Sequence, residues 1–141
     1  MTTFRSEASI IRLAAAVVTD RRGRTLLVRK RGTLAFMQAG GKIDEGETPL
    51  EALAREIREE LGCEIGSLRR SLGRFTAPAA NEPDCVVEAE LFAVDLVGDV
   101  CPAAEIEEIA WHAPDDSEPR TLAPLTRDHV LPLVRSEGRL A

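Results

Sequence analysis

The sequence predicts an α/β fold, in which helices pack on the faces of a mixed β-sheet. Two observations favour this class. Runs of β-branched and apolar residues bounded by turn residues recur along the chain, and helical patterns stand in the middle and at the end of it. Strands that alternate with helices in this order are typical of layered α/β domains. At 141 residues, the chain fits a single domain, 1–141, that can bury a core without disulfides or structural metal.

The first part of the chain predicts a β-hairpin and a loop. Residues 9–19 are rich in Ile, Val and Ala, and the turn-forming segment 20–23 separates them from a second strand at 25–29. A short apolar piece, 34–38, then leads into Ala39-Gly40-Gly41, where the chain needs backbone freedom.

A helix over about 48–61 has the clearest local signals in the chain. Thr48 is a natural N-cap, Pro49 suits the first helical position, and Glu51 completes a capping box with Thr48. Gly62 stands where a left-handed residue ends a helix. Helical spacing of apolar residues predicts one buried face, made of Leu50, Leu53, Ala54, Ile57 and Leu61.

The second half predicts three further strands and a closing helix. The strands are expected at 68–76, 86–97 and 106–112. The segment 126–136 has helical spacing, and Pro132 within it predicts a kink, because proline lacks the N–H that continues a helix.

Composition and charge exclude several classes of protein. The net charge of −6 argues against a nucleic-acid polymer as partner, and a phosphate substrate would need a bound cation to attract it. Three cysteines without metal-ligand spacing, at 63, 85 and 101, indicate reduced thiols. Residues 1–7 lack the apolar stretch of a secretory signal, and the longest apolar run, 13–18, is too short to cross a bilayer. We therefore expect a cytoplasmic protein without a membrane partner.

Three glutamates, Glu56, Glu59 and Glu60, cluster on the helix away from its apolar face. Like charges at this spacing repel, each i,i+4 pair costing about 0.2–0.5 kcal/mol. One interpretation is a solvated acidic face relieved by Arg55, which gives no reason for three clustered acids. The other is a Mg²⁺ site, with Mn²⁺ as a substitute, because such ions are shared between a few carboxylates and substrate phosphates.

The spacing around this helix resembles the Nudix box, Gly-x5-Glu-x7-Arg-Glu-U-x-Glu-Glu-x-Gly-U, where U is a bulky aliphatic residue. The match runs from Gly41 through Glu47 and Arg55 to Gly62, and all seven fixed positions agree. Cys63 fills the last aliphatic position, where we expect a buried small hydrophobe. The chain is thus similar to the Nudix (MutT-type) hydrolase superfamily, which implies an α/β/α sandwich around a mixed β-sheet.

The resemblance implies a role for each residue of the box. Glu56, Glu59 and Glu60 would bind divalent metal, Arg55 would orient these carboxylates, and Glu47 would support the site from the loop before the helix. Glu56 is also a candidate for the catalytic base, although the base varies in the family and sometimes lies outside the box.

Further candidates lie beyond the box. Many family members place a glutamate six residues before a tryptophan, and Glu105 precedes Trp111 by that interval. Glu105 is either an extra metal or base carboxylate or an ordinary surface acid, and Trp111 either stacks on a nucleobase or packs at the core edge. Weaker candidates for the same carboxylate are Glu82, Glu88 and Glu90.

Several residues are candidates to contact the substrate. Gly41 and Lys42 lie directly before the helix, and Lys42 is well placed for a phosphate. Arg29 and Arg31 could reach the phosphates from the strand end, the alternative being a solvated strand end. Alternation places these two arginines on one face of the strand and Lys30 on the other.

The resemblance implies hydrolysis of a pyrophosphate linkage in a nucleoside diphosphate linked to another moiety. A modified nucleoside triphosphate, ADP-ribose, a dinucleoside polyphosphate and a nucleotide sugar all suit the box. Two alternatives are a domain that senses a nucleotide metabolite without cleaving it and a prenyl-diphosphate isomerase. The intact box argues against both, because such proteins tend to lose its glutamates. Ala39 departs from the proline that is common at this position of the family. Dimers are common in the family, so a homodimer is one expectation.

Overall fold

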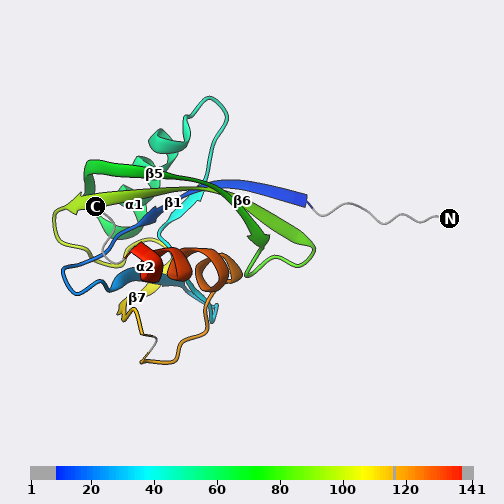
Figure 1. The fold of residues 1–141 in the computed structure, drawn as a ribbon. Coiled ribbons are helices and arrows are strands. Elements are labelled where there is room, and N and C mark those ends of the chain that lie inside the picture. The colour runs from blue at the N-terminus through cyan, green and yellow to red at the C-terminus, as the bar shows by residue number, and fades with distance from the viewer. Residues whose placement is uncertain (1–8, 116, 138–141) are drawn as a thin grey trace.

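The computed structural model describes residues 9–115 and 117–137, which form an α/β/α sandwich (Figure 1). The larger sheet has the strand order β4-β1-β6-β5, made of β1 (Ser9–Val17), β4 (Gly40–Lys42), β5 (Glu64–Pro78) and β6 (Cys85–Val97). A smaller sheet has the order β3-β2-β7, made of β2 (Thr25–Lys30), β3 (Phe36–Met37) and β7 (Ile106–His112). Since β1 runs parallel to β6 and antiparallel to β4, the larger sheet is mixed, as predicted.

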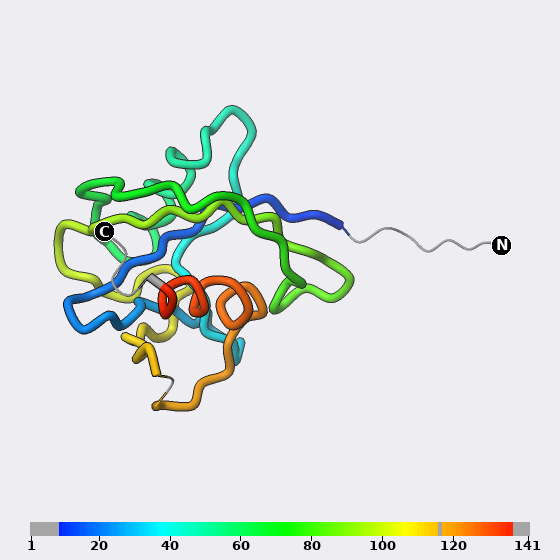
Figure 2. Tube along the Cα trace, in the orientation of Figure 1, coloured from blue at the N-terminus to red at the C-terminus, as the bar shows by residue number. Residues whose placement is uncertain are grey.

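Strand β1 separates two cores, because its alternate side chains face opposite sides of the sheet. Ala14 and Ala16 pack in the core beneath helix α1 (Pro49–Leu61). Ala15 and Val17 belong to the second core, which is covered by the π-helical turn η1 (Thr126–Val130) and helix α2 (Leu131–Glu137). The orange-to-red path of η1 and α2 can be followed in Figure 2.

Helix α1 begins and ends where the sequence predicts. The hydroxyl of Thr48 accepts a hydrogen bond from the Glu51 N–H at 3.1 Å, and Glu51 Oε1 accepts one from the Thr48 N–H at 2.9 Å. Gly62, with φ at +69°, ends the helix and donates its N–H to the carbonyl of Arg58. Of the predicted apolar face, Leu53, Ile57 and Leu61 are fully buried, while Leu50 and Ala54 are partly buried. Glu60, which was predicted to lie away from this face, is buried as well.

Strand β5 and the segment before Pro132 differ from the expected elements. Strand β5 is longer than predicted, since its hairpin with β6 pairs from Glu64 opposite Val97 to Pro78 opposite Val86. The segment around Pro132, where the sequence predicts a kink, begins as η1, in which the Leu131 N–H donates to the Thr126 carbonyl, five residues back instead of four.

The structure tests some of the predictions made from the cysteines and the apolar segments. Cys63 is 3% exposed in the core beneath α1, which confirms its predicted role as a small buried hydrophobe. All three cysteines are free. No helix in the described part of the chain is long and apolar enough to span a membrane. The amino-terminal segment 1–7, considered above as a secretory signal, lies outside the described residues.

The capping box gives a prediction about stability. Thr48→Ala removes the side-chain acceptor for the Glu51 N–H, so we expect the free energy of unfolding in urea to fall by about 1 kcal/mol. Thr48→Ser is the matched control, because it keeps the hydroxyl and should behave like the parent protein. Equal stability of the alanine variant and the parent would contradict the cap.

Candidate functional site

Two adjacent glycines bring β4 close to helix α1. Gly40 and Gly41 pair with Ala15 and Ala14 of β1, and the Gly40 N–H donates to Glu60 Oε1 at 3.1 Å. A Cβ atom on Gly40 would collide with the Ala14 carbonyl, and one on Gly41 would collide with the Glu56 carboxylate. Glycine at both positions therefore lets the loop lie this close to the helix without displacing the Ala14 carbonyl or the Glu56 carboxylate.

Arg55 ties the preceding loop to the helix. Its Nε and Nη2 atoms donate to the two carboxylate oxygens of Glu47 at 2.8 and 2.9 Å, and its Nη1 donates to Glu56 Oε2 at 2.9 Å. Nη2 also donates to the carbonyl of Lys42 at 3.0 Å. The hydrogen bonds from Arg55 lower the pKa of Glu47 to about 2, and those to Glu47 raise the pKa of Arg55. Both ions therefore stay charged at neutral pH.

Two of the three helix glutamates are largely buried. Glu60 is 2% exposed, and burial raises its pKa to about 7 against the opposing effects of the Gly40 N–H and Lys30. Burial also raises the pKa of Glu56, which the hydrogen bond from Arg55 partly offsets. Glu59 stays half-exposed, 3.8 Å from Arg55. A buried carboxylate such as Glu60, whose direct partner is one backbone N–H, favours a bound cation.

The donor chemistry of this group suits a hard divalent cation, because every candidate ligand is a carboxylate oxygen. Within 9–115 and 117–137, however, no three His, Cys, Asp or Glu side chains are already arranged as a metal site. Two of the carboxylates have protein partners instead, since Arg55 holds Glu56 and the Gly40 N–H holds Glu60. Metal binding by Glu56, Glu59, Glu60 and Glu105 therefore stays a prediction.

Glu105 and Lys30 lie next to the helix glutamates. The Lys30 Nζ atom is 4.0 Å from Glu105 Oε2, and both charges act on Glu60. Glu105 itself is well exposed, so its two expected roles, as a ligand or as a surface acid, stay predictions.

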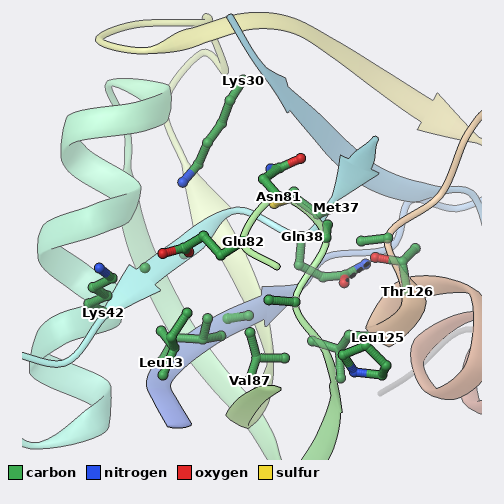
Figure 3. A pocket seen from close by; sticks show the side chains of 18 residues that line it. Leu13, Lys30, Met37, Gln38, Lys42, Asn81, Glu82, Val87, Leu125 and Thr126 are labelled. Carbon is green, nitrogen blue, oxygen red and sulfur yellow. Dashed lines mark hydrogen bonds between the residues drawn. The ribbon is translucent and has the colours of Figure 1, made fainter. Parts of the chain in front are cut away.

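Arg29 and Arg31 lie on the opposite face of the strand end from Lys30. Arg29 of β2 pairs with Glu108 of β7, and Arg31, directly after β2, pairs with Glu107 of β7, each at 3.1 Å. Lys30, on the opposite face, lines a pocket beside α1, and Figure 3 shows its tip pointing toward the helix. The alternation of side chains along the strand predicted that Lys30 and the two arginines lie on opposite faces, but it could not tell which face meets the site. Substrate contacts by Arg29 and Arg31 stay predictions.

The pocket next to Gly40 and Gly41 has mainly apolar walls (Figure 3). Strands β1 and β6 and the segment before η1 supply Ile11, Leu13, Val87 and Leu125. Lys30 and Lys42 lie on its α1 side. Its other polar side chains include Gln38, Asn81, Glu82 and Thr126. Of these, Gln38 and Thr126 were not singled out from the sequence, because no local pattern marks them.

Three further candidates lie outside this pocket. Trp111 packs against the core beneath α1 and does not line the pocket, so the packing interpretation is the one that its position supports. Glu88 and Glu90 line a separate hollow together with Glu47, and they pair with arginines at 3.2 and 3.3 Å.

Comparisons with known proteins agree with this architecture. A NUDIX domain model matches residues 11–134. The CTP pyrophosphohydrolase of Escherichia coli (strain K12) is 29% identical over 122 residues, which cover 82% of this chain and 84% of that protein. The 8-oxo-dGTP diphosphatase of Haemophilus influenzae is 38% identical over 60 residues, 40% of this chain, and the match spans only 44% of that relative. The structure of a MutT NUDIX hydrolase from Burkholderia pseudomallei superposes with a TM-score of 0.71 at 23% identity, covering 92% of this chain and 98% of that one.

The buried Glu60 predicts a pH-dependent stability in metal-free protein. Its pKa in the folded state, about 7, lies above the ordinary value of 4.5, so the folded state binds the proton more tightly than the unfolded chain. The resulting stabilisation is complete below about pH 4.5 and is lost as the pH rises through about 7. In EDTA, Glu60→Gln should remove this loss, so the variant should gain stability relative to the parent between these pH values. Urea unfolding at several pH values checks this, and parallel pH profiles for the two proteins would refute it.

Proposed function

Because this chain belongs to the NUDIX family, we propose that it hydrolyses a pyrophosphate bond in a nucleoside diphosphate linked to another moiety. The observation that supports this most strongly is the close approach of the loop to α1. Arg55 joins Glu47 to Glu56, and the Gly40 N–H joins the loop to Glu60, directly beside a pocket that two lysines flank. Carboxylates for a cation and cationic side chains for phosphates therefore lie next to a cavity for the rest of a substrate.

Glu56, Glu59, Glu60 and Glu105 are the residues that would hold a divalent cation, Mg²⁺ in the first place and Mn²⁺ as its substitute. Such an ion, when bound, neutralises phosphate oxygens and makes water a stronger nucleophile. Lys30 and Lys42 line the pocket on the same side, where their charges would attract phosphates despite the net charge of −6.

We assign proton removal from the attacking water to Glu56. Arg55 contacts its Oε2 atom, which orients the carboxylate and leaves Oε1 to accept a proton. Burial raises the pKa of Glu56 and so makes it a better base than an exposed carboxylate. Glu105 is the second candidate for this role, because its charge also acts on Glu60 across the same space.

The relatives guide the choice of substrates to test. Both the CTP pyrophosphohydrolase and the 8-oxo-dGTP diphosphatase are named for nucleoside triphosphates, so we place these compounds before ADP-ribose and nucleotide sugars. A sensor that binds nucleotides without cleaving them is the alternative function. The complete set of box glutamates favours the hydrolase, which would act on small nucleotides in the cytoplasm.

Loss of one buried carboxylate tests the proposed activity. Glu60→Gln removes a negative charge with little change in shape, so we expect kcat with Mg²⁺ to fall about 100-fold or more while the fold stays intact. Release of pyrophosphate or phosphate from a panel of nucleotides is the measurement, and circular dichroism reports the fold. Glu118→Gln, an exposed carboxylate that pairs with Arg120, is the matched control and should keep parent activity. Normal turnover by Glu60→Gln would overturn the metal assignment.

A methyl group at Gly41 tests the loop approach separately. Gly41→Ala places its Cβ against the Glu56 carboxylate, which sits at the end of a flexible side chain and can move away. We therefore expect the melting temperature to change little and kcat/KM to fall on the order of 100-fold, because small displacements of catalytic groups are costly. An alanine variant with parent kinetics would show that the position of Glu56 does not matter.

A further inference from the structure

A single buried amide interrupts the apolar pocket beside α1. Gln38 follows strand β3, lines the pocket and is 5% exposed. The neighbouring walls are aliphatic, and none of the residues that line this pocket is aromatic. Ring stacking on an aromatic side chain therefore cannot select a ligand here, and selection falls to the polar groups.

Thr126 fixes how the amide of Gln38 is used. The Thr126 hydroxyl donates to Gln38 Oε1 at 2.8 Å, and Thr126 is itself fully buried, so little water competes for this bond. Figure 3 shows the two side chains meeting at the edge of the pocket near Leu125. The bond from Thr126 fixes the orientation of the amide, with Oε1 toward Thr126 and the Nε2 donors left to meet a ligand.

The Nε2 atom of Gln38 is buried and has no hydrogen-bond partner within the described residues. Buried donors without an acceptor are uncommon in folded proteins, because each loses its bonds to water without replacement. An acceptor on a ligand that fills the pocket would restore the missing hydrogen bond.

We propose that Gln38 is a specificity-determining residue, which donates from Nε2 to an exocyclic carbonyl oxygen of a nucleobase bound in this pocket. The inference rests on the proposed function, which puts the phosphates beside α1 and the two lysines and so leaves the apolar pocket for the base. A carbonyl oxygen accepts the bond, whereas an exocyclic amino group would set donor against donor. Thr126 is then a positioning residue that acts through Gln38.

Deletion of one substrate oxygen tests this pairing. Inosine triphosphate is compared with purine riboside triphosphate, which lacks the 6-oxygen, and UTP with the 2-pyrimidinone analogue, which lacks the 4-oxygen. In the parent protein we expect kcat/KM to favour at least one keto compound about tenfold or more over its partner. Gln38→Met keeps the chain length and removes the donor, so the same ratio should fall to about 1.

Two other variants separate hydrogen bonding from packing. Thr126→Val frees the amide to turn and should lower the ratio part of the way. Leu125→Val alters the apolar wall and should weaken both members of a pair equally, so the ratio stays at its parent value. Each result is a ratio of two kcat/KM values measured with the same protein. A partial loss of folded enzyme lowers both values equally and leaves the ratio unchanged.

Different results would overturn the role of Gln38 and the proposed hydrolase function. Hydrolysis without discrimination by the parent, or a ratio unchanged in Gln38→Met, would overturn the role of Gln38 and leave the hydrolase in place. Absence of hydrolysis with all four compounds and the wider nucleotide panel would overturn the proposed function, and this inference with it.

Discussion

Buried negative charge on helix α1 is the constraint on which the site depends. An ionised carboxylate in a low-dielectric environment needs a partner, because it has lost its hydration. Glu56 has Arg55, whereas Glu60 has one backbone N–H and the more distant charge of Lys30. The protein thus supplies less positive charge than its carboxylates require. That deficit is what suits the site to a divalent cation and, through the cation, to a diphosphate.

The rest of the fold holds these charges in place. The capping box and Gly62 fix both ends of α1, which packs against β1, β4 and β5. Pairing of β4 with β1 holds Gly40 and Gly41 against the helix, close enough that a side chain at either position would collide. The same short strand borders the apolar pocket, so the proposed positions of the phosphates and the base share one wall.

Local rules explain what the sequence could predict, and long-range packing explains what it could not. Helix α1 was predictable because its caps and apolar spacing act within a few residues. Alternation separated Lys30 from Arg29 and Arg31, yet the face that meets α1 is set by how the two sheets pack. The contact between Gln38 and Thr126 joins residues 88 positions apart, and no local pattern marks it. The catalytic roles of the box residues came from family resemblance, and they stay predictions.

The location of a bound cation tests the account most directly. Crystals grown with Mn²⁺ and a non-hydrolysable nucleoside triphosphate would show the ion by its anomalous scattering. The account predicts Mn²⁺ between the carboxylates of Glu56 and Glu60 and the phosphates, with the base in the pocket lined by Gln38. A bound nucleotide with no ion at α1, or with the ion held by other residues, would contradict it.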